Sequence, residues 1–246
     1  SNSDVLGSAK GWAGGFLFNE KAKKALDNFY ARPDTLSLGI CNGCQLMAEL
    51  GVVYPEHEKK HKMLHNDSHK FESNFISVEI PKDHSVMFGS LSGSKLGIWV
   101  AHGEGKFSFP YEEKEYHIAL KYNYEGYPAN PNGSPWSVAG VCSHDGRHLA
   151  MMPHLERAMF PWQCGYYPED RRNSDEVTPW IEGFVNARKW IEEHKKLYLD
   201  RKLRYNNIAQ RFLFMKGLSI THLNIIHYEK DCFIIVDVRG VSGQCT

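Results

Sequence analysis

Apolar positions in the first fifty residues follow first a helical and then an extended period. Residues 19–31 (NEKAKKALDNFYA) carry apolar side chains at helical spacing, and Pro33 ends the run. Residues 35–41 (TLSLGIC) alternate apolar and small side chains, as a strand does. Residues 45–50 return to the helical pattern, and Gly51 ends this second helix. Helix, strand, tight turn and helix together predict an α/β fold.

The middle of the chain is predicted to be rich in strands. Stretches separated by loops of glycine, proline and asparagine read as extended at 74–81, 95–102 and 116–124. Two further strands flank the pair Asp145-Gly146, which is a strong hairpin signal, and the second of them leads to Pro153-His154. We therefore expect an antiparallel portion beside the α/β part.

The last clear element is a helix over residues 178–196, with Thr178 as its cap and Pro179 in its first turn. Its apolar positions form one face. Composition shifts after this helix. In the tail, residues 224–238 (NIIHYEKDCFIIVDV) could pair as a hairpin, although nothing before them predicts where it would dock.

Composition narrows the classes of protein to consider. The 246 residues are 42% hydrophobic and 24% charged, which is ordinary for a globular chain. Lysine plus arginine and aspartate plus glutamate each number 29, so no overall positive charge favours nucleic acid as a partner. No apolar run reaches about 18 residues and the start lacks a secretory signal pattern, so we expect a cytoplasmic protein without a membrane contact.

Six cysteines are too sparse for a disulfide scaffold in a chain of this length, so we expect free thiols. Cys41 stands out because it lies at the predicted turn from strand to helix, with Gly39 two residues before it and Gly43 two residues after it. This is the spacing of a nucleophile elbow. The start of the helix favours thiolate over thiol at Cys41. Cys44 lies one turn further on and fits a packing role.

Two metal-binding alternatives compete with a nucleophile. A zinc site at Cys41-x-x-Cys44 needs two more ligands at a matching spacing, and no second pair of that kind stands near a comparable turn. Four histidines repeat every four residues and would form a metal-binding stripe on a continuous helix; they are His57, His61, His65 and His69. Their flanks are highly polar, so we interpret this region as a solvated helix or loop and assign no metal site.

A base for the cysteine is predicted after the second hairpin strand. His154 and Glu156 in MMPHLER are two residues apart, and in an extended chain such residues face the same side. The carboxylate can then fix the tautomer of the imidazole. We therefore pair His154, as general base and acid, with Cys41 as nucleophile.

Several stretches carry a resemblance to a known family. GICNGCQ, VAHGEG, YPANPNGSP and PHLER, in this order, resemble the C-terminal glutaminase domain of the large single-chain phosphoribosylformylglycinamidine synthases of purine biosynthesis. The resemblance covers residues 1–196. It implies an open, mostly parallel sheet with helices on both faces, of the class I glutamine amidotransferase type. The remaining 197–246 are unlike the family, and we treat them as a separate tail.

The resemblance also implies roles for individual residues. The family's triad falls on Cys41, His154 and Glu156, with Gln45 as a contact to the substrate glutamine and the backbone N–H of Asn42 as an oxyanion donor. Hydrolysis would pass through a γ-glutamyl thioester and release ammonia. The implied partner is the synthase domain of the same parent polypeptide, which would hold ATP and magnesium, and no cofactor is expected on this chain.

Two departures from the family pattern bear on activity. Leu155 stands where the family usually has proline, and we expect little effect because that side chain should point away from the His154–Glu156 pair. The chain begins at Ser1 just inside the motif whose loop supplies the second oxyanion donor, so we expect an N-terminally truncated domain.

Other functions stay open at this stage. The chain could be a catalytically silent interaction module, or a glutaminase or cysteine hydrolase serving another pathway. His102 and Glu104 in VAHGEG could contact substrate or brace a turn, and we favour bracing.

Overall fold

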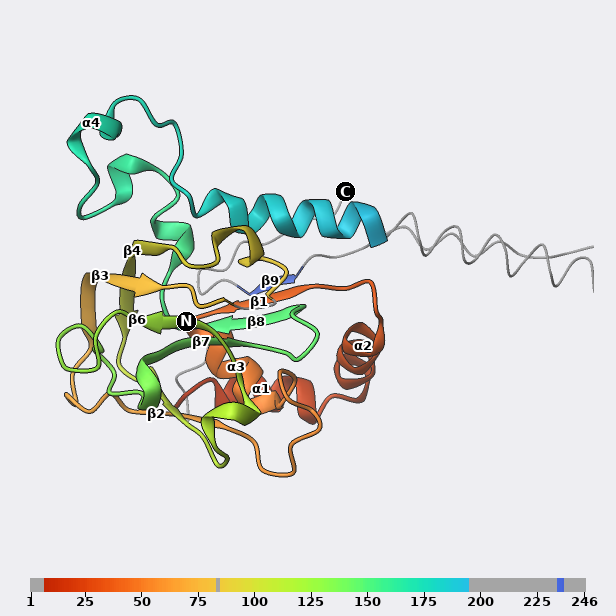
Figure 1. Cartoon of the computed structure of the whole chain (residues 1–246). Coiled ribbons are helices and arrows are strands. Elements are labelled where there is room, and N and C mark those ends of the chain that lie inside the picture. The colour runs from red at the N-terminus through yellow and green to blue at the C-terminus, as the bar shows by residue number, and fades with distance from the viewer. Residues whose placement is uncertain (1–6, 83–84, 195–233, 237–246) are drawn as a thin grey trace, which may run out of the picture.

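A mixed seven-stranded sheet with the order β4-β3-β6-β7-β8-β1-β9 organises the molecule. The computed structural model describes residues 7–82 and 85–194, together with the backbone of 234–236 (Figure 1). The strands of this sheet are β1 (Ser37–Ile40), β3 (Glu72–Glu79), β4 (Lys95–His102), β6 (His117–Tyr122), β7 (Val138–Cys142), β8 (His148–Met151) and β9 (Ile234–Val236). A separate two-stranded sheet joins β2 (Lys62–Leu64) to β5 (Lys106–Ser108).

The α-helices lie mostly at the two ends of the described region. They are α1 (Lys10–Leu17), α2 (Glu20–Ala31), α3 (Asn42–Leu50), the short α4 (Glu169–Arg172) and a helix over 181–194. Figure 1 shows α3 and α1 on one side of the sheet and the helix over 181–194 on the other. Within the described ranges, every helix is too short or too polar to span a bilayer.

The elements predicted from periodicity are present, but the last helix begins at 181 instead of following Thr178 directly, and its predicted end at 195–196 lies outside the described residues. Asn19 caps α2, because its side-chain oxygen accepts hydrogen bonds from two backbone N–H groups of the first turn. Gly51 ends α3 in the left-handed conformation, with φ of 71°. Helix α1 was not predicted from the pattern; its sequence KGWAGGFL contains two adjacent glycines, which lower helix propensity.

Strand pairing confirms the α/β class with an antiparallel portion, which is larger than the expected mostly parallel sheet implied: among the described strands of this sheet, two pairings are parallel and four are antiparallel. Strand β1 pairs in parallel with β8 on one side and with β9 on the other. The pairs β3–β4, β3–β6, β6–β7 and β7–β8 are antiparallel, and the last is the predicted hairpin. Of the hairpin predicted within 224–238, the structure describes only β9, so that prediction lies largely outside the described residues.

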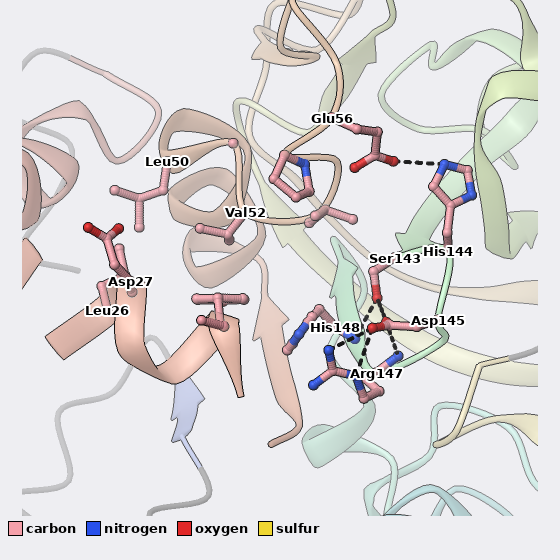
Figure 2. A pocket seen from close by; sticks show the side chains of 15 residues that line it. Leu26, Asp27, Leu50, Val52, Glu56, Ser143, His144, Asp145, Arg147 and His148 are labelled. Atoms are coloured by element: carbon pink, nitrogen blue, oxygen red, sulfur yellow. Dashed lines mark hydrogen bonds and ion pairs between the residues drawn. The ribbon is translucent and has the colours of Figure 1, made fainter. Parts of the chain in front are cut away.

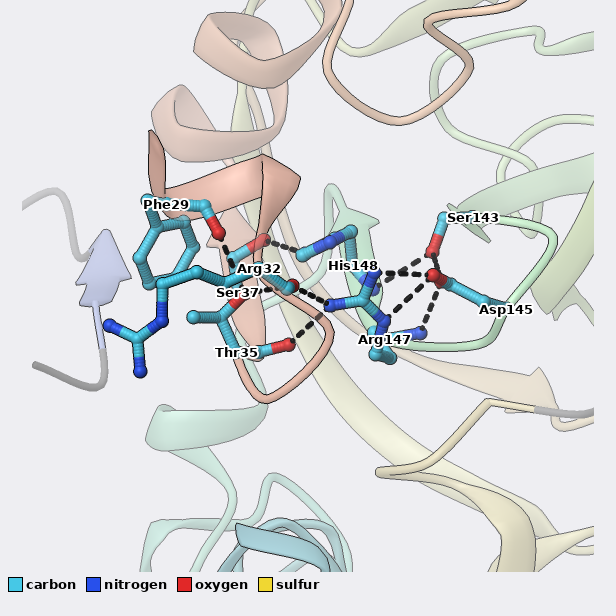
Figure 3. A network of polar contacts seen from close by, with 8 residues as sticks. All are labelled: Phe29, Arg32, Thr35, Ser37, Ser143, Asp145, Arg147 and His148. Atoms are coloured by element: carbon cyan, nitrogen blue, oxygen red, sulfur yellow. Dashed lines mark hydrogen bonds and ion pairs between the residues drawn. The ribbon is translucent and has the colours of Figure 1, made fainter. Parts of the chain in front are cut away.

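The amino end of β8 borders a cavity of about 650 Å³, lined also by α2, by the segment after α3 and by the β7–β8 turn (Figure 2). Beside it, Arg147 joins the segments that lead into β1 and β8 (Figure 3). Its guanidinium donates to the carbonyl oxygens of Arg32 (2.7 Å) and Thr35 (3.1 Å) and pairs with Asp145 (2.7 Å). These bonds fix the register of β1 against β8, which places the carboxyl ends of the two strands side by side.

The histidine stripe that was weighed as a metal-binding alternative does not form on a helix, because strand β2 and turns occupy its segment. His69 is exposed, but His61 is buried, with 2% of its surface exposed. Burial, and then the proximity of His57, lower the pKa of His61 to about 4. The interpretation of a solvated segment is therefore wrong for His61, which packs among aromatic rings near Phe107 and Phe109.

Gly39 allows α3 to approach β1 closely. A Cβ atom on Gly39 would lie 2.5 Å from Sδ of Met47 and 2.7 Å from the carbonyl oxygen of Gly43, and the latter is backbone that cannot rotate away. We expect Gly39→Ala to lower the free energy of unfolding by about 1–3 kcal/mol in chemical denaturation. Gly89→Ala is the matched control, since a Cβ there meets open space and should change stability by no more than about 0.5 kcal/mol. Equal effects of the two substitutions would contradict the close packing.

Candidate active site

Cys41 occupies a strained turn between β1 and α3. Its backbone has φ of 53° and ψ of −104°, a conformation that residues with a side chain rarely adopt. Its N–H donates to the carbonyl oxygen of Met151 at the end of β8 (2.8 Å), and its carbonyl oxygen accepts from the N–H of Gln45 (3.0 Å). The turn is thus held both by the neighbouring strand and by the first turn of the helix that follows.

Cys41 is the residue that precedes the first turn of α3, so its thiol lies at the amino end of the helix, where the first backbone N–H groups have no partner within the helix. The helix dipole at this end favours the thiolate. The residue is 8% exposed, and its sulfur lies 3.6 Å from the carbonyl oxygen of Ala101 on β4. The thiol therefore faces β4, and Cys41 borders the main core cluster.

Cys44 differs from Cys41 in its environment. It is fully buried in the core cluster. Burial, and then the proximity of Cys41, raise the pKa of the Cys44 thiol well above its ordinary value. Cys44 is consequently a neutral packing residue at physiological pH, as the sequence indicated. Cys41 and Cys44 belong to no metal-ligating group within the part of the chain that the structure describes.

His154 and Glu156 form a direct pair. Nδ1 of His154 lies 2.7 Å from Oε1 of Glu156. Because a carboxylate only accepts hydrogen bonds, Nδ1 carries the hydrogen and Nε2 of the neutral ring is the proton acceptor. Nε2 is buried and has no hydrogen-bond partner among the described residues.

The backbone around this pair differs from the prediction. The sequence argument assumed an extended chain, whereas His154 precedes a 3-10 turn, η4 (Leu155–Arg157). The pair forms because this turn also brings residues two apart together. The side chain of Leu155 is fully buried in the core. It therefore points away from the partly exposed Glu156, as predicted.

The fold brings Cys41 and His154 to the same edge of the sheet. They follow the carboxyl ends of β1 and β8, which are parallel neighbours with Ile40 paired to Met151. Both are also held by β4, although β4 lies at the far end of the strand order. The N–H of His154 donates to the carbonyl oxygen of Trp99 (2.8 Å), two residues before the Ala101 that faces the Cys41 sulfur. Two strand residues span about 6.6 Å, so the sheet curls to bring both groups into one small region.

The predicted substrate-contacting side chains form hydrogen bonds within the protein. The side-chain amide of Asn42 donates to Oε1 of Gln45 (2.8 Å), and Nε2 of Gln45 donates to the carbonyl oxygen of Glu104 (2.8 Å). These bonds tie α3 to the segment after β4. They engage one of the two Nε2 hydrogens of Gln45, so a ligand contact by this residue stays a prediction.

His102 and Glu104 brace the segment after β4. The carboxylate of Glu104 accepts hydrogen bonds from the N–H (2.6 Å) and hydroxyl of Ser8, just before α1. His102 is 2% exposed, with Nδ1 3.2 Å from Oδ1 of Asn66. The Asn66 amide also donates to the carbonyl oxygen of His102 (2.8 Å). The bracing role is supported by these contacts.

The imidazole of His102 is uncharged at neutral pH. Burial, and then the proximity of His154, lower the pKa of His102 to about 4. Sequence reasoning missed Asn66, which also accepts from the N–H of Gly105 (3.0 Å). The only sequence signal for it was its place in the polar stretch HNDSHK.

Comparison with known proteins identifies what this arrangement is similar to. A family model described as a CobB/CobQ-like glutamine amidotransferase domain matches residues 1–191. A protein of Arabidopsis thaliana named probable phosphoribosylformylglycinamidine synthase, chloroplastic/mitochondrial, is 46% identical over 212 residues, covering 78% of this chain and 15% of the relative. The Homo sapiens phosphoribosylformylglycinamidine synthase is 42% identical over 219 residues, covering 78% of this chain and 16% of the relative.

Among solved structures, one titled "Structure of PurLQS from Thermotoga maritima" matches with a TM-score of 0.54 and 23% identity. The match covers 79% of this chain and 75% of that chain, and it shows a shared fold. This chain spans only about 15 to 16% of the length of the two curated relatives.

The contrast between the two cysteines of α3 can be measured by thiol alkylation. In the folded chain we expect iodoacetamide to modify Cys41 at least roughly 10-fold faster than Cys44, because Cys44 is buried with a raised pKa while the helix end favours the Cys41 thiolate. Peptide mass spectrometry after timed quenching gives both rates. In urea the two rates should converge; equal rates in the folded chain would contradict the assignment.

Proposed function

Since this chain belongs to the CobB/CobQ-like glutamine amidotransferase domain family, we propose that it hydrolyses the side-chain amide of glutamine, with Cys41 as nucleophile, His154 as general base and acid, and Glu156 as the orienting carboxylate. The observation that carries the proposal is the 2.7 Å His154–Glu156 pair at the sheet edge where Cys41 leaves the neighbouring parallel strand.

The first chemical step forms a thioester. Nε2 of His154 takes the proton of the Cys41 thiol, while Glu156 holds Nδ1–H and stabilises the imidazolium. The sulfur attacks the amide carbon of glutamine and gives a tetrahedral intermediate. His154 returns the proton to the nitrogen, the carbon–nitrogen bond breaks, and ammonia leaves behind a γ-glutamyl thioester.

The second step restores the enzyme. His154 takes a proton from water, and the hydroxide attacks the thioester carbonyl. The carbon–sulfur bond then breaks to release glutamate, and His154 returns its proton to the leaving Cys41 sulfur. In both steps negative charge develops on the carbonyl oxygen. We assign the stabilisation of this oxygen to the backbone N–H of Asn42, which is the first residue of α3. Hydrolysis by this route requires no cofactor on this chain.

The relatives suggest where the ammonia is used. Those named phosphoribosylformylglycinamidine synthase are about six times longer than the matched region, since the match covers 15 to 16% of their length. The chain would supply ammonia to the synthase portion of such a polypeptide, where formylglycinamide ribonucleotide is amidated with ATP and magnesium. Residues 1–196 would form this glutaminase domain, and 197–246 a separate tail.

Glutamine hydrolysis can be tested directly with triad variants. We expect glutamate release, followed with glutamate dehydrogenase in the presence of the synthase portion, to be abolished in Cys41→Ala and reduced roughly 10²–10⁴-fold in kcat in Glu156→Gln, because the carboxylate no longer fixes the charged ring. Cys44→Ala is the matched control; it removes a buried thiol one turn away and should keep the activity of the parent chain.

Labelling separates the alternative functions. A diazo-ketone analogue of glutamine should modify Cys41 in the folded chain and be blocked by glutamine. A chain that is folded by circular dichroism but is neither labelled nor active would instead be a silent interaction module. Glutamine hydrolysis at the same rate with and without the synthase portion would point to a glutaminase of another pathway.

A further inference from the structure

A cluster of potential metal ligands lies at the edge of the sheet opposite Cys41. His144 lies in the turn that leads into β8, so it stands near the amino end of that strand, whereas Cys41 follows the carboxyl end of β1. Glu56 and His144 both line the cavity beside this turn and face one another in Figure 2. The cluster therefore shares no residue with the Cys41 site.

Three side chains from two distant segments supply the ligand atoms. One ligand atom each from Glu56, His57 and His144 lies within 4.8 Å of the other two. Nε2 of His144 is already 2.8 Å from Oε1 of Glu56. Nδ1 of His57 is buried and has no hydrogen-bond partner in the described ranges, which leaves that nitrogen available to a ligand.

Both imidazoles are held in place by one buried aromatic ring. Tyr54 stacks on His57 with ring centroids 5.0 Å apart and contacts His144 edge-on at 5.5 Å. Tyr54 is 3% exposed, and its hydroxyl donates to the carbonyl oxygen of Cys142 (2.9 Å), two residues before His144. The rings of Tyr111 and Tyr116 also pack against His57, with ring centroids 4.8 and 5.2 Å from that of the imidazole. Ligands fixed in this way lose little freedom when they bind an ion.

We propose that Glu56, His57 and His144 form a binding site for a divalent transition-metal ion of the zinc class. Two imidazoles and one carboxylate suit zinc, cobalt or nickel, whereas magnesium and calcium prefer oxygen ligands throughout. The side chains of Glu56 and His144 are each 47% exposed, so an ion can enter from solvent. Three protein ligands leave a position for water on the cavity side.

The bound ion would have a structural effect. It would cross-link the segment after α3 to the β7–β8 turn, two regions that otherwise meet at the Glu56–His144 pair and through Tyr54. An ion that binds the folded state but not the unfolded state raises the free energy of unfolding by mass action. The simpler interpretation of the same residues is a surface histidine–carboxylate hydrogen bond beside an aromatic cluster, and metal binding distinguishes the two.

Isothermal titration of the full chain with zinc chloride tests the site. We expect one ion per chain and a rise in thermal midpoint with zinc but not with magnesium chloride. Glu56→Gln and His144→Gln should each weaken zinc binding at least roughly 10-fold. Glu56→Gln replaces a half-exposed side chain with one of equal size, so folding should be preserved. The matched control is His69→Asn, since His69 is an exposed histidine outside the cluster whose φ of 54° asparagine tolerates.

Absorption spectra of the cobalt complex test whether a cysteine thiolate binds the metal ion instead. The cobalt complex should show ligand-field bands without a thiolate charge-transfer band, and its spectrum should be lost in His144→Gln. The proposal is overturned if zinc does not bind the folded parent chain, if the Glu56 and His144 variants bind zinc as the parent does, or if the cobalt spectrum shows thiolate ligation. Because the readout is metal binding rather than glutamine hydrolysis, failure here leaves the proposed catalytic function untouched.

Discussion

The close contact between β1 and α3 at the strained turn of Cys41 is the constraint on which the rest of the site depends. A backbone conformation of this kind costs of order 1–3 kcal/mol and persists only where its surroundings impose it. The bond from the Cys41 N–H to Met151 and the absence of a side chain at Gly39 impose it here. Together they project the thiol from the sheet edge and leave it at the amino end of a helix.

The antiparallel half of the sheet completes the site. In strand β4 the carbonyl oxygen of Trp99 accepts a hydrogen bond from the His154 N–H, and the carbonyl oxygen of Ala101 faces the Cys41 sulfur. The backbone of β4 therefore sets the spacing between His154 and Cys41. The indole N–H of Trp99 in turn donates to the carbonyl oxygen of Gln163 (2.8 Å), which anchors β4 beyond the site. A parallel α/β layer alone would supply the elbow and the base but not this common support.

The two edges of the sheet carry different chemistry. At the amino edge, Arg147 locks the register of β1 and β8, and the proposed metal ligands Glu56 and His144 join neighbouring loops. At the carboxyl edge, the same register sets Cys41 beside the segment that carries His154. Because both strands have only four residues, order at their amino ends also orders their carboxyl ends, where Cys41 and the segment with His154 begin.

The sequence by itself determined the longer strands, the helices α2 and α3, the elbow at Cys41 and the nearness of His154 to Glu156, because periodicity, turn residues and a separation of two positions are local properties. It did not indicate α1 or the short elements α4, β2 and β5. Only the tertiary structure decided the contact of Cys41 with Ala101, which is 60 positions away, and the burial of His61. The same holds for the hydrogen bonds between Asn66 and His102 and for the contact between Glu56 and His144. Such contacts arise when the sheet curls and distant loops pack together, and the free energy of that packing leaves no periodic trace along the chain.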